Sequence, residues 1–346
     1  MKTKRDLEII NFLKTEGASS SKEIFDNLTL DISYATLKRN LTKLIAEKSI
    51  ESLGKGKSTK YIISSAYKLL ESIDLDKYFE KEIDDRNIKE NFNLYVITNT
   101  LDENSVFTNK ELEKLDSLQN DYKKNIEQLS KIEYKKELDR LAIDLSWKSS
   151  QIEGNTYSLL ETERLLKERE TASGKTKEEA TMLLNHKDAL DFIIDNPDYL
   201  QPLSVSKIED IHSILIKELA VDRNLRKRRV GISGTNYRPL ENEFQILEAL
   251  KSTCDLINSK ESTFEKALLA LVLISYIQPF MDGNKRTARI ISNAILMNGN
   301  YCPLSFRTVD SIDYKKAMLL FYEQNNISRF KEIFISQFEF AIRTYF

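Results

Sequence analysis

The clearest chemistry in this sequence lies in a short polar run, residues 282–289, between an apolar segment and an apolar helical pattern. A loop that opens a helix exposes backbone N–H groups and the positive end of the helix dipole, so it attracts anions. Gly283 permits the positive φ that such an anion-binding nest requires. Asp282 is a hard oxygen ligand suited to a Mg²⁺ that accompanies phosphates. Three cations add positive charge: Lys285, Arg286 and Arg289. The run therefore predicts a site for a nucleotide polyphosphate.

The wider run, residues 278–289, resembles the signature of the Fic family, in which a His and a Phe precede an acidic residue, Gly-Asn and an Arg-x-x-Arg pair. The resemblance implies an enzyme that transfers AMP from ATP, with Mg²⁺, to a hydroxyl side chain of a target protein. It implies catalytic roles at Gln278, Asp282, Asn284 and Arg286. It implies nucleotide contacts at Gly283, Asn284, Lys285, Arg286 and Arg289, with Asp282 as the metal ligand.

Gln278 departs from the signature, because the family has its catalytic His at this position. An imidazole accepts the proton of an attacking hydroxyl near neutral pH, whereas a carboxamide is too weak a base. Loss of general-base help costs about 10²- to 10⁴-fold in rate, while positioning and charge stabilisation remain. We therefore expect ATP binding with impaired or absent transfer. The two histidines of the chain, His186 and His212, lie in helical patterns and are interpreted as structural.

Lys285 leaves undecided whether AMP or phosphate is the group that is transferred. Most AMP-transferring members of the family have Gly at this position, and Lys resembles the branch of death-on-curing toxins, which transfer phosphate. That branch generally lacks the second Arg of the signature, which Arg289 supplies here. The resemblance therefore favours AMP transfer and keeps phosphate transfer as an alternative.

A second block, Ser149-x-x-x-Glu153-Gly154, resembles the inhibitory motif of the family. The resemblance implies that Glu153, on an inhibitory helix near residues 149–155, pairs with Arg289. That arginine would otherwise hold the γ-phosphate of ATP. A carboxylate in the guanidinium fork competes with phosphate for the same donors, and the competition is expected to weaken ATP binding by about 1–3 kcal/mol.

Residues 228–239 alternate in polarity and contain two glycines, which predicts a short hairpin. The resemblance identifies this hairpin as the flap, which clamps the target segment by strand-like backbone pairing. The positions that correspond to the clamp are Ile232, Ser233, Gly234 and Thr235.

The composition indicates a helical protein without a polyanion partner for the whole chain. The net charge of the 346 residues is −2, and there are only 9 Gly and 5 Pro. The two cysteines do not make a disulfide framework, and the longest apolar run, residues 267–277, is too short to span a bilayer. The sequence predicts a cytoplasmic protein without a membrane partner.

The N-terminal region has a different charge: residues 1–65 hold 12 Lys or Arg and 8 Asp or Glu, a net charge of +4. Three helical patterns followed by a basic hairpin resemble a winged helix-turn-helix, whose third helix enters the major groove of DNA. The expected DNA contacts are Thr36, Lys38, Arg39, Lys43, Lys55 and Lys57. DNA binding would imply a homodimer, and the alternative for this region is a protein-interaction module.

These observations predict a mainly α protein in three parts. Residues 1–66 form the winged helix-turn-helix, residues 67–110 a helical connection, and residues 111–346 an all-helical Fic domain with a short β-hairpin flap. The favoured function is an autoinhibited and impaired protein adenylyltransferase. One alternative is a DNA-binding transcriptional regulator whose Fic domain senses nucleotide. The others are removal of AMP from modified targets and phosphotransfer.

Overall fold

The computed structural model describes residues 2–29 and 32–346, and it leaves the side chain of Lys57 undescribed. The chain divides into two compact units, residues 1–72 and 73–346. Residues 73–110 therefore belong to the same unit as residues 111–346. The predicted phosphate contact of Lys57 lies outside the described part of the chain.

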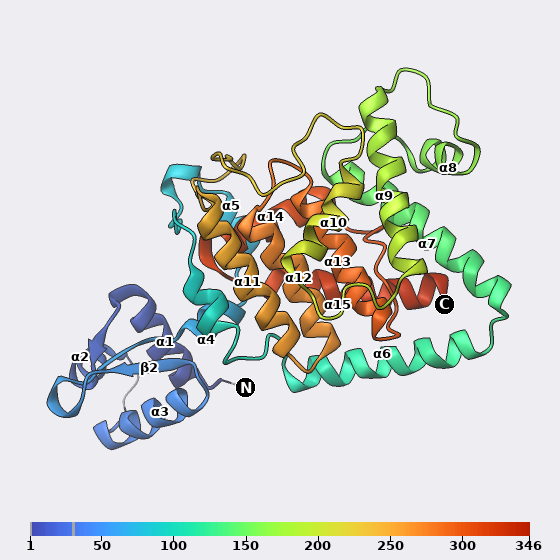
Figure 1. Ribbon diagram of the computed structural model, residues 1–346. Helices are drawn as coiled ribbons and strands as arrows, with labels where there is room; N and C mark the ends of the chain where they lie inside the picture. Colours follow the sequence, from blue (N-terminus) through green and yellow to red (C-terminus); the bar gives the residue numbers. More distant parts are fainter. Residues whose placement is uncertain (1, 30–31) are drawn as a thin grey trace. The chain divides into compact units, whose positions relative to one another are not determined.

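The first unit combines helices with one small antiparallel sheet (Figure 1). Its elements are α1 (Lys4–Glu16), β1 (Ser19–Ser20), α2 (Ser21–Asn27), α3 (Tyr34–Ala46), β2 (Ile50–Leu53), the 3₁₀ turn η1 (Gly56–Ser58), β3 (Lys60–Ile63) and α4 (Ser65–Leu70). The strand order is β1-β3-β2, and Ile50 pairs with Ile63. Ser20 and Ser33 cap α2 and α3, because each hydroxyl accepts a backbone N–H two or three residues into the helix. The winged helix-turn-helix remains our interpretation of this unit.

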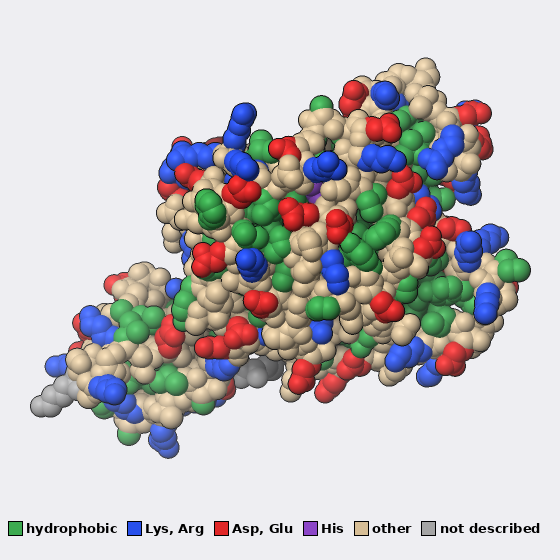
Figure 2. Space-filling view, in the orientation of Figure 1, with side chains coloured by type: hydrophobic (Ala, Val, Ile, Leu, Met, Phe, Trp, Pro, Cys, Tyr) green, Lys and Arg blue, Asp and Glu red, His purple; other side chains and the backbone are tan. Residues whose placement is uncertain are grey.

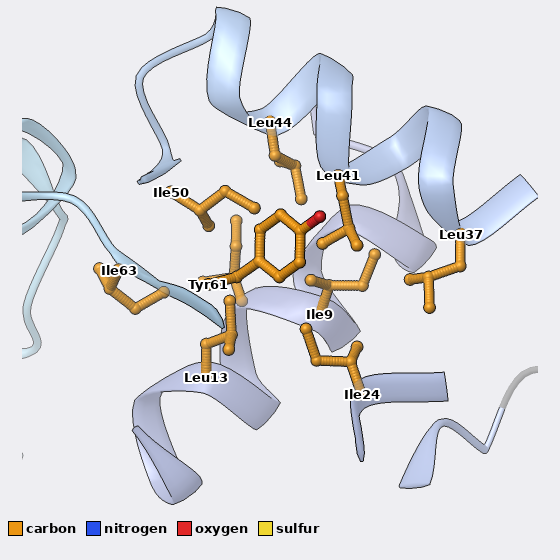
Figure 3. Packing of buried hydrophobic residues seen from close by; sticks show 10 residues of the cluster. Ile9, Leu13, Ile24, Leu37, Leu41, Leu44, Ile50, Tyr61 and Ile63 are labelled. Carbon is orange, nitrogen blue, oxygen red and sulfur yellow. The ribbon is translucent and has the colours of Figure 1, made fainter. Parts of the chain in front are cut away.

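One apolar core holds the helices of the first unit against its sheet. Figure 3 shows side chains from α1, α2 and α3 pointing toward Tyr61 of β3. The residues of this core include Ile9, Leu13, Ile24, Leu37, Leu41, Leu44, Ile50 and Ile63. Leu37, Leu41 and Leu44 follow each other at helical spacing, so one face of α3 is buried. The opposite face of α3 is left for solvent or a partner.

The second unit is built of helices. Its elements are α5 (Leu75–Phe79), the 3₁₀ turn η2 (Ile83–Asp85), the π-helical turn η3 (Val96–Thr100), α6 (Asn109–Glu127), α7 (Lys131–Ile152), α8 (Leu159–Glu168), α9 (Lys177–Asp195), α10 (Val205–Leu215), α11 (Glu243–Ser259), α12 (Thr263–Ile277), α13 (Asn284–Asn298), α14 (Ser311–Gln324) and α15 (Ser328–Tyr345). The predicted mainly α class is confirmed.

Helix α12 forms the centre of the second unit, because every residue from Phe264 to Ile277 except Lys266 is buried. Figure 1 shows α11, α13 and α14 around it, with α10 and α9 beyond α13. A helix buried on all sides gives the loop at its end a rigid support. That loop, residues 278–283, carries the signature into α13.

Residues 228–239 turn back on themselves, but their two arms do not pair as strands. The turn lies at Ser233 and Gly234, and Gly234 has a φ of 88°. The second arm forms instead a single bridge between Arg238 and Asn91, in an earlier segment of the chain. The predicted hairpin is therefore a loop, because its backbone finds a partner outside itself.

The surface of the protein shows no separation of charge on the face seen in Figure 2, where basic and acidic side chains are interspersed. Within the described residues, no helix is both long and apolar enough to cross a bilayer.

Leu41→Ala tests the core of the first unit. Leu41 is 1% exposed, so its truncation should lower the free energy of unfolding of this unit by about 2–5 kcal/mol. The matched control is Leu53→Ala, because Leu53 is 46% exposed and should change the stability by less than about 0.5 kcal/mol. Native-state hydrogen exchange of α3 amides measures both, and equal losses would contradict the assigned core.

Candidate functional site

The loop between α12 and α13 has two residues in the left-handed region of backbone space. Gln278 ends α12 with φ 52° and ψ 59°, and Gly283 precedes α13 with φ 79°. A Cβ added at Gly283 would lie 3.3 Å from Cδ2 of His212, so glycine suits this position on both conformational and steric grounds. The positive φ that the sequence predicts for Gly283 is therefore present, and anion binding at the start of α13 stays a prediction.

The side chain of Asn284 forms hydrogen bonds with the backbone of this loop. Its Oδ1 accepts the backbone N–H of Phe280 at 2.8 Å, and its Nδ2 donates to the carbonyl oxygen of Phe280 at 2.9 Å. The same Nδ2 lies 3.1 Å from Oε1 of Gln278. The side chain of Asn284, which is buried, thus fixes the loop. Its predicted contact with nucleotide stays a prediction.

His212 supports the loop from beneath. Its ring stacks on Phe280 with centroids 3.6 Å apart, and its Nε2 lies 3.0 Å from the backbone oxygen of Asp282. Burial lowers the pKa of His212, so the neutral ring can donate one N–H to that carbonyl. The ring is fully buried and is engaged with the backbone, which agrees with the structural role expected from the sequence.

The carboxamide of Gln278 is occupied at both ends. Nε2 donates to the carbonyl oxygen of Ser275 at 2.6 Å and lies 3.1 Å from the hydroxyl of Tyr322, while Oε1 accepts from Asn284. Burial raises the pKa of Tyr322, so its hydroxyl stays protonated and supplies no base. At this position of the loop the structure therefore presents no side chain able to take a proton at neutral pH.

Arg226 is a residue of the site that sequence reasoning missed. It is buried, and its Nε donates to the carbonyl oxygen of Gln278 at 2.6 Å. Its Nη1 donates to the carbonyl of Arg228 at 2.9 Å. The carbonyls at the end of α12 carry the negative end of the helix dipole, which favours a cation there. Nothing in the local sequence distinguishes Arg226 from the exposed cations that follow it.

The predicted contact between Glu153 and Arg289 is present. Nη2 of Arg289 donates to Oε1 of Glu153 at 2.9 Å, and the guanidinium is fully buried while the carboxylate is 21% exposed. Ser149 binds the same guanidinium, with its Oγ accepting from Nε at 2.9 Å and its carbonyl accepting from Nη2 at 3.0 Å, while Nη1 has no hydrogen-bond partner among the described residues. Helix α7 ends at Ile152, and Gly154 with φ 100° turns the chain away, so Glu153 stands at the helix end facing α13.

Lys285 makes a second contact with Glu153 that the sequence reasoning did not foresee. Its Nζ lies 3.2 Å from Oε2, so each carboxylate oxygen has its own cation. Burial alone would raise the pKa of Glu153, but Arg289 and Lys285 outweigh it and lower the pKa below its ordinary value. The carboxylate is therefore ionised at neutral pH and bound on both sides.

Asp282 and Arg286 form the outer part of the site. Nη2 of Arg286 lies 3.1 Å from Oδ2 of Asp282, with the guanidinium 1% and the carboxylate 62% exposed. Within the described residues no cluster of three acidic, His or Cys side chains could hold a metal ion by itself. One exposed carboxylate fits Mg²⁺ only as a partner to phosphate oxygens and water, which is how Mg²⁺ is commonly bound with nucleotides.

A cavity of about 360 Å³ joins some of these parts. Glu153, Gln278 and Lys285 lie on its wall, whereas Asp282, Asn284, Arg286 and Arg289 do not line it. Three flap residues line the opposite part: Gly231, Ile232 and Ser233. Helix α14 closes it with Lys315, Met318, Leu319 and Tyr322. The volume is within the usual range for small-molecule sites.

The expected DNA contacts of the first unit differ in their exposure and in whether another side chain already binds them. Lys38 and Arg39 are exposed on α3, and Lys55 is exposed beside η1, while Thr36 is half-buried beside its helix cap. Lys43 is engaged, because its Nζ lies 2.7 Å from the buried carboxylate of Asp6. Lys43 therefore neutralises a buried charge on α1, and Lys38 and Arg39 are the better candidates for phosphate contact.

Comparison with known proteins places the signature region in a family. Residues 202–296 match the model of the Fic/DOC family. The chain is 31% identical to the protein adenylyltransferase Fic of Nematostella vectensis over 173 residues, which are 48% of this chain and 40% of that protein. It is 30% identical to the protein adenylyltransferase fic-1 of Caenorhabditis elegans over 176 residues, which are 48% of this chain and 34% of that protein. The matches therefore span less than half the length of these relatives.

Solved structures show the same fold. Fic-1 from Caenorhabditis elegans aligns with a TM-score of 0.60 at 20% identity, covering 68% of this chain and 72% of that chain. A Fic family protein from Desulfovibrio desulfuricans aligns with a TM-score of 0.59 at 18% identity, covering 69% of this chain and 74% of that chain. At these identities the likeness is evidence of fold, and it agrees with the helical Fic domain expected from the sequence.

The pH dependence of stability tests the charge of Glu153. Its pKa is lowered in the folded protein, so the ion pairs stabilise the fold above the ordinary glutamate pKa of about 4.3, and this contribution is lost as pH falls through the folded value. Glu153→Gln should lower the free energy of unfolding by about 1–3 kcal/mol at pH 7. The difference from the parent protein should shrink below about pH 4.3.

Urea denaturation at a series of pH values measures this difference. Glu261→Gln is the matched control, because Glu261 is exposed, and it should show a much smaller difference at every pH. A difference for Glu153→Gln that grew on acidification would contradict an ionised, doubly paired carboxylate.

Proposed function

Because the chain is a Fic-domain protein, we propose that its second unit binds ATP and transfers AMP to a hydroxyl of a target protein, and that this activity is held in an inhibited state. The observation that carries the proposal is the contact of Glu153 with Arg289 and Lys285 on the wall of the cavity. The curated relatives are named protein adenylyltransferases, and they support this activity for the part of the chain that matches them.

Inhibition follows from competition for the same donors. The proposed role of Arg289 is to hold the γ-phosphate, but its Nη2 is already bound to Glu153 and its Nε to Ser149. Lys285 holds the second oxygen of the carboxylate, which makes the inhibitory group harder to displace than a single pair would. Removal of Glu153 is therefore expected to free two cations for the nucleotide.

In the transfer step, the hydroxyl oxygen of the target attacks the α-phosphorus of ATP, the bond to the β-phosphate breaks, pyrophosphate leaves and the proton of the hydroxyl passes to solvent water. The N–H groups at the start of α13, with Arg286 and Arg289, are suited to stabilise the phosphate charges. Asp282 would hold Mg²⁺ together with the phosphates, and the ion would neutralise part of their charge. Gln278 orients groups by hydrogen bonding but accepts no proton, so the step should be slow in this chain.

Label transfer from α-labelled ATP tests the proposal. The chain with Glu153→Gly and the chain with Glu153→Gly and Gln278→His are each incubated with Mg²⁺, ATP and host lysate. The second should label protein about 10²- to 10⁴-fold faster, because imidazole restores the general base. Asp282→Ala in the double variant is the control, and it should abolish the gain.

Three results separate the alternatives. Tighter ATP binding by Glu153→Gly, measured by calorimetry, supports the competition. Absence of labelling in the double variant despite ATP binding would refute AMP transfer. Label from γ-labelled ATP instead would indicate phosphotransfer.

A second candidate function is DNA binding by the first unit. The observation that favours it is a pair of exposed cations, Lys38 and Arg39, on the face of α3 opposite its buried leucines. Lys38 also lies over the rings of Tyr34 and Tyr61, which hold it near the helix surface. The two functions are compatible in one chain.

Mobility shifts on genomic fragments at low salt test this second function. Lys38→Ala with Arg39→Ala should weaken binding and reduce the slope of log K against log salt by about 1–2. Lys4→Ala with Arg5→Ala is the matched control, since it removes the same charge from α1 and should change affinity less. Equal losses in the two variants would indicate net charge alone, and no shift at any salt would refute the function.

A further inference from the structure

The flap loop is fastened by a segment far from it in sequence, residues 83–91. Nη2 of Arg86 donates to the carbonyl oxygen of Gly234 at 2.7 Å, at the turn of the loop. Nδ2 of Asn236 donates to Oδ1 of Asp84 at 3.0 Å. The backbone N–H of Arg238 donates to the carbonyl oxygen of Glu90 at 2.6 Å. These three contacts, at residues 84, 86 and 90 of one segment and 234, 236 and 238 of the other, hold the two segments beside each other.

Arg86 joins the loop to the helical core. Its guanidinium lies 3.3 Å from the carboxylate of Glu323 on α14, and the two side chains are 3% and 0% exposed. Glu323 also accepts the hydroxyl of Tyr78 at 2.7 Å, and the guanidinium lies over the ring of Phe79. A guanidinium fork can bind two acceptors in fixed directions, so one buried side chain fixes Gly234 relative to α14.

The second arm of the flap is also held from inside. The ring of Tyr237 is buried and stacks on Tyr276 and Tyr322, with centroids 5.2 Å away in each case. Its hydroxyl donates to the carbonyl oxygen of Tyr276 at 3.1 Å. Tyr322 is also a partner of Gln278. Residues 234–238 are therefore fixed on two sides, beside the loop where transfer is proposed to occur.

The first arm of the flap differs from the second in its backbone hydrogen bonding. Among the described residues, the backbone groups of Gly231, Ile232 and Ser233 have no hydrogen-bond partner, and these three residues line the cavity. Unpaired backbone N–H and C=O groups are available for pairing with the backbone of another chain. The edge of the second arm is already occupied by residues 83–91, so only the first arm is open.

We propose that residues 83–91 are a clasp that fixes the second arm of the flap and so holds residues 231–233 at the wall of the cavity, where the resemblance places the target segment. Arg86 is the central positioning residue. This inference rests on the proposed AMP transfer for its functional consequence, although the clasp itself does not. A loop held in place before binding loses less conformational entropy when the target segment pairs with it.

Hydrogen exchange of the flap tests the clasp without any enzyme activity. Asp84→Ala removes one exposed contact, and Arg86→Lys keeps a cation beside Glu323 but lacks the fork that also reaches Gly234. Both variants should speed amide exchange at Tyr237 and Arg238, the flap amides that have hydrogen-bond partners, at least several-fold, with exchange in α12 unchanged. Asp85→Ala is the matched control, because Asp85 is an exposed neighbour without a contact to the flap, and it should leave the loop unchanged.

Label transfer measures the consequence for the target. In the background of Glu153→Gly and Gln278→His, Arg86→Lys should reduce labelling of lysate proteins several-fold, while affinity for a fluorescent ATP analogue stays the same. Unchanged flap exchange in both clasp variants would overturn the proposal, and so would faster exchange throughout the second unit or loss of nucleotide affinity. If the background itself labels nothing, the proposed transfer fails, and the exchange result still decides the clasp.

Discussion

The site depends on a buried guanidinium that must have an anion beside it. Arg289 lies within the helical core, where an unpaired charge would be costly, and Glu153 supplies the counter-charge in this structure. A phosphate group could supply the same charge. The contact with Glu153 and the proposed nucleotide complex are therefore alternative ways to satisfy one cation. Lys285 shifts the balance toward Glu153, because it binds the second oxygen of the same carboxylate.

The loop that precedes α13 is rigid for a related reason. Its left-handed residues are stabilised by contacts from three directions: Arg226 at the end of α12, Asn284 within the loop and the ring of His212 beneath it. Such a loop needs little rearrangement to bind phosphate, which favours electrostatic stabilisation. Gln278 takes part in this network through both ends of its carboxamide. The residue at the position of the family's base therefore supports the loop and has no basic group to offer.

The two sides of the cavity are built differently. The phosphate side rests on helices that meet at α12, while the flap side is a loop fastened by an earlier segment of the chain. The contact of Arg86 with both Glu323 and Gly234 connects these sides through α14, which also lines the cavity. The arrangement leaves the unpaired backbone of residues 231–233 on the wall of the cavity.

The sequence by itself determined the helical class, the positive φ at Gly283 before a helix and the pairing of Glu153 with Arg289. Periodicity and turn geometry are local properties, and the pair was carried by a family motif. Only the tertiary structure decided the roles of Arg226 and Arg86, the contact of Lys43 with Asp6 and the replacement of a hairpin by a clasped loop. In each of these cases a charged or backbone group found a partner far away in the chain. Which partner lies close enough depends on how the helices pack, and no local sequence pattern predicts which distant residues come into contact.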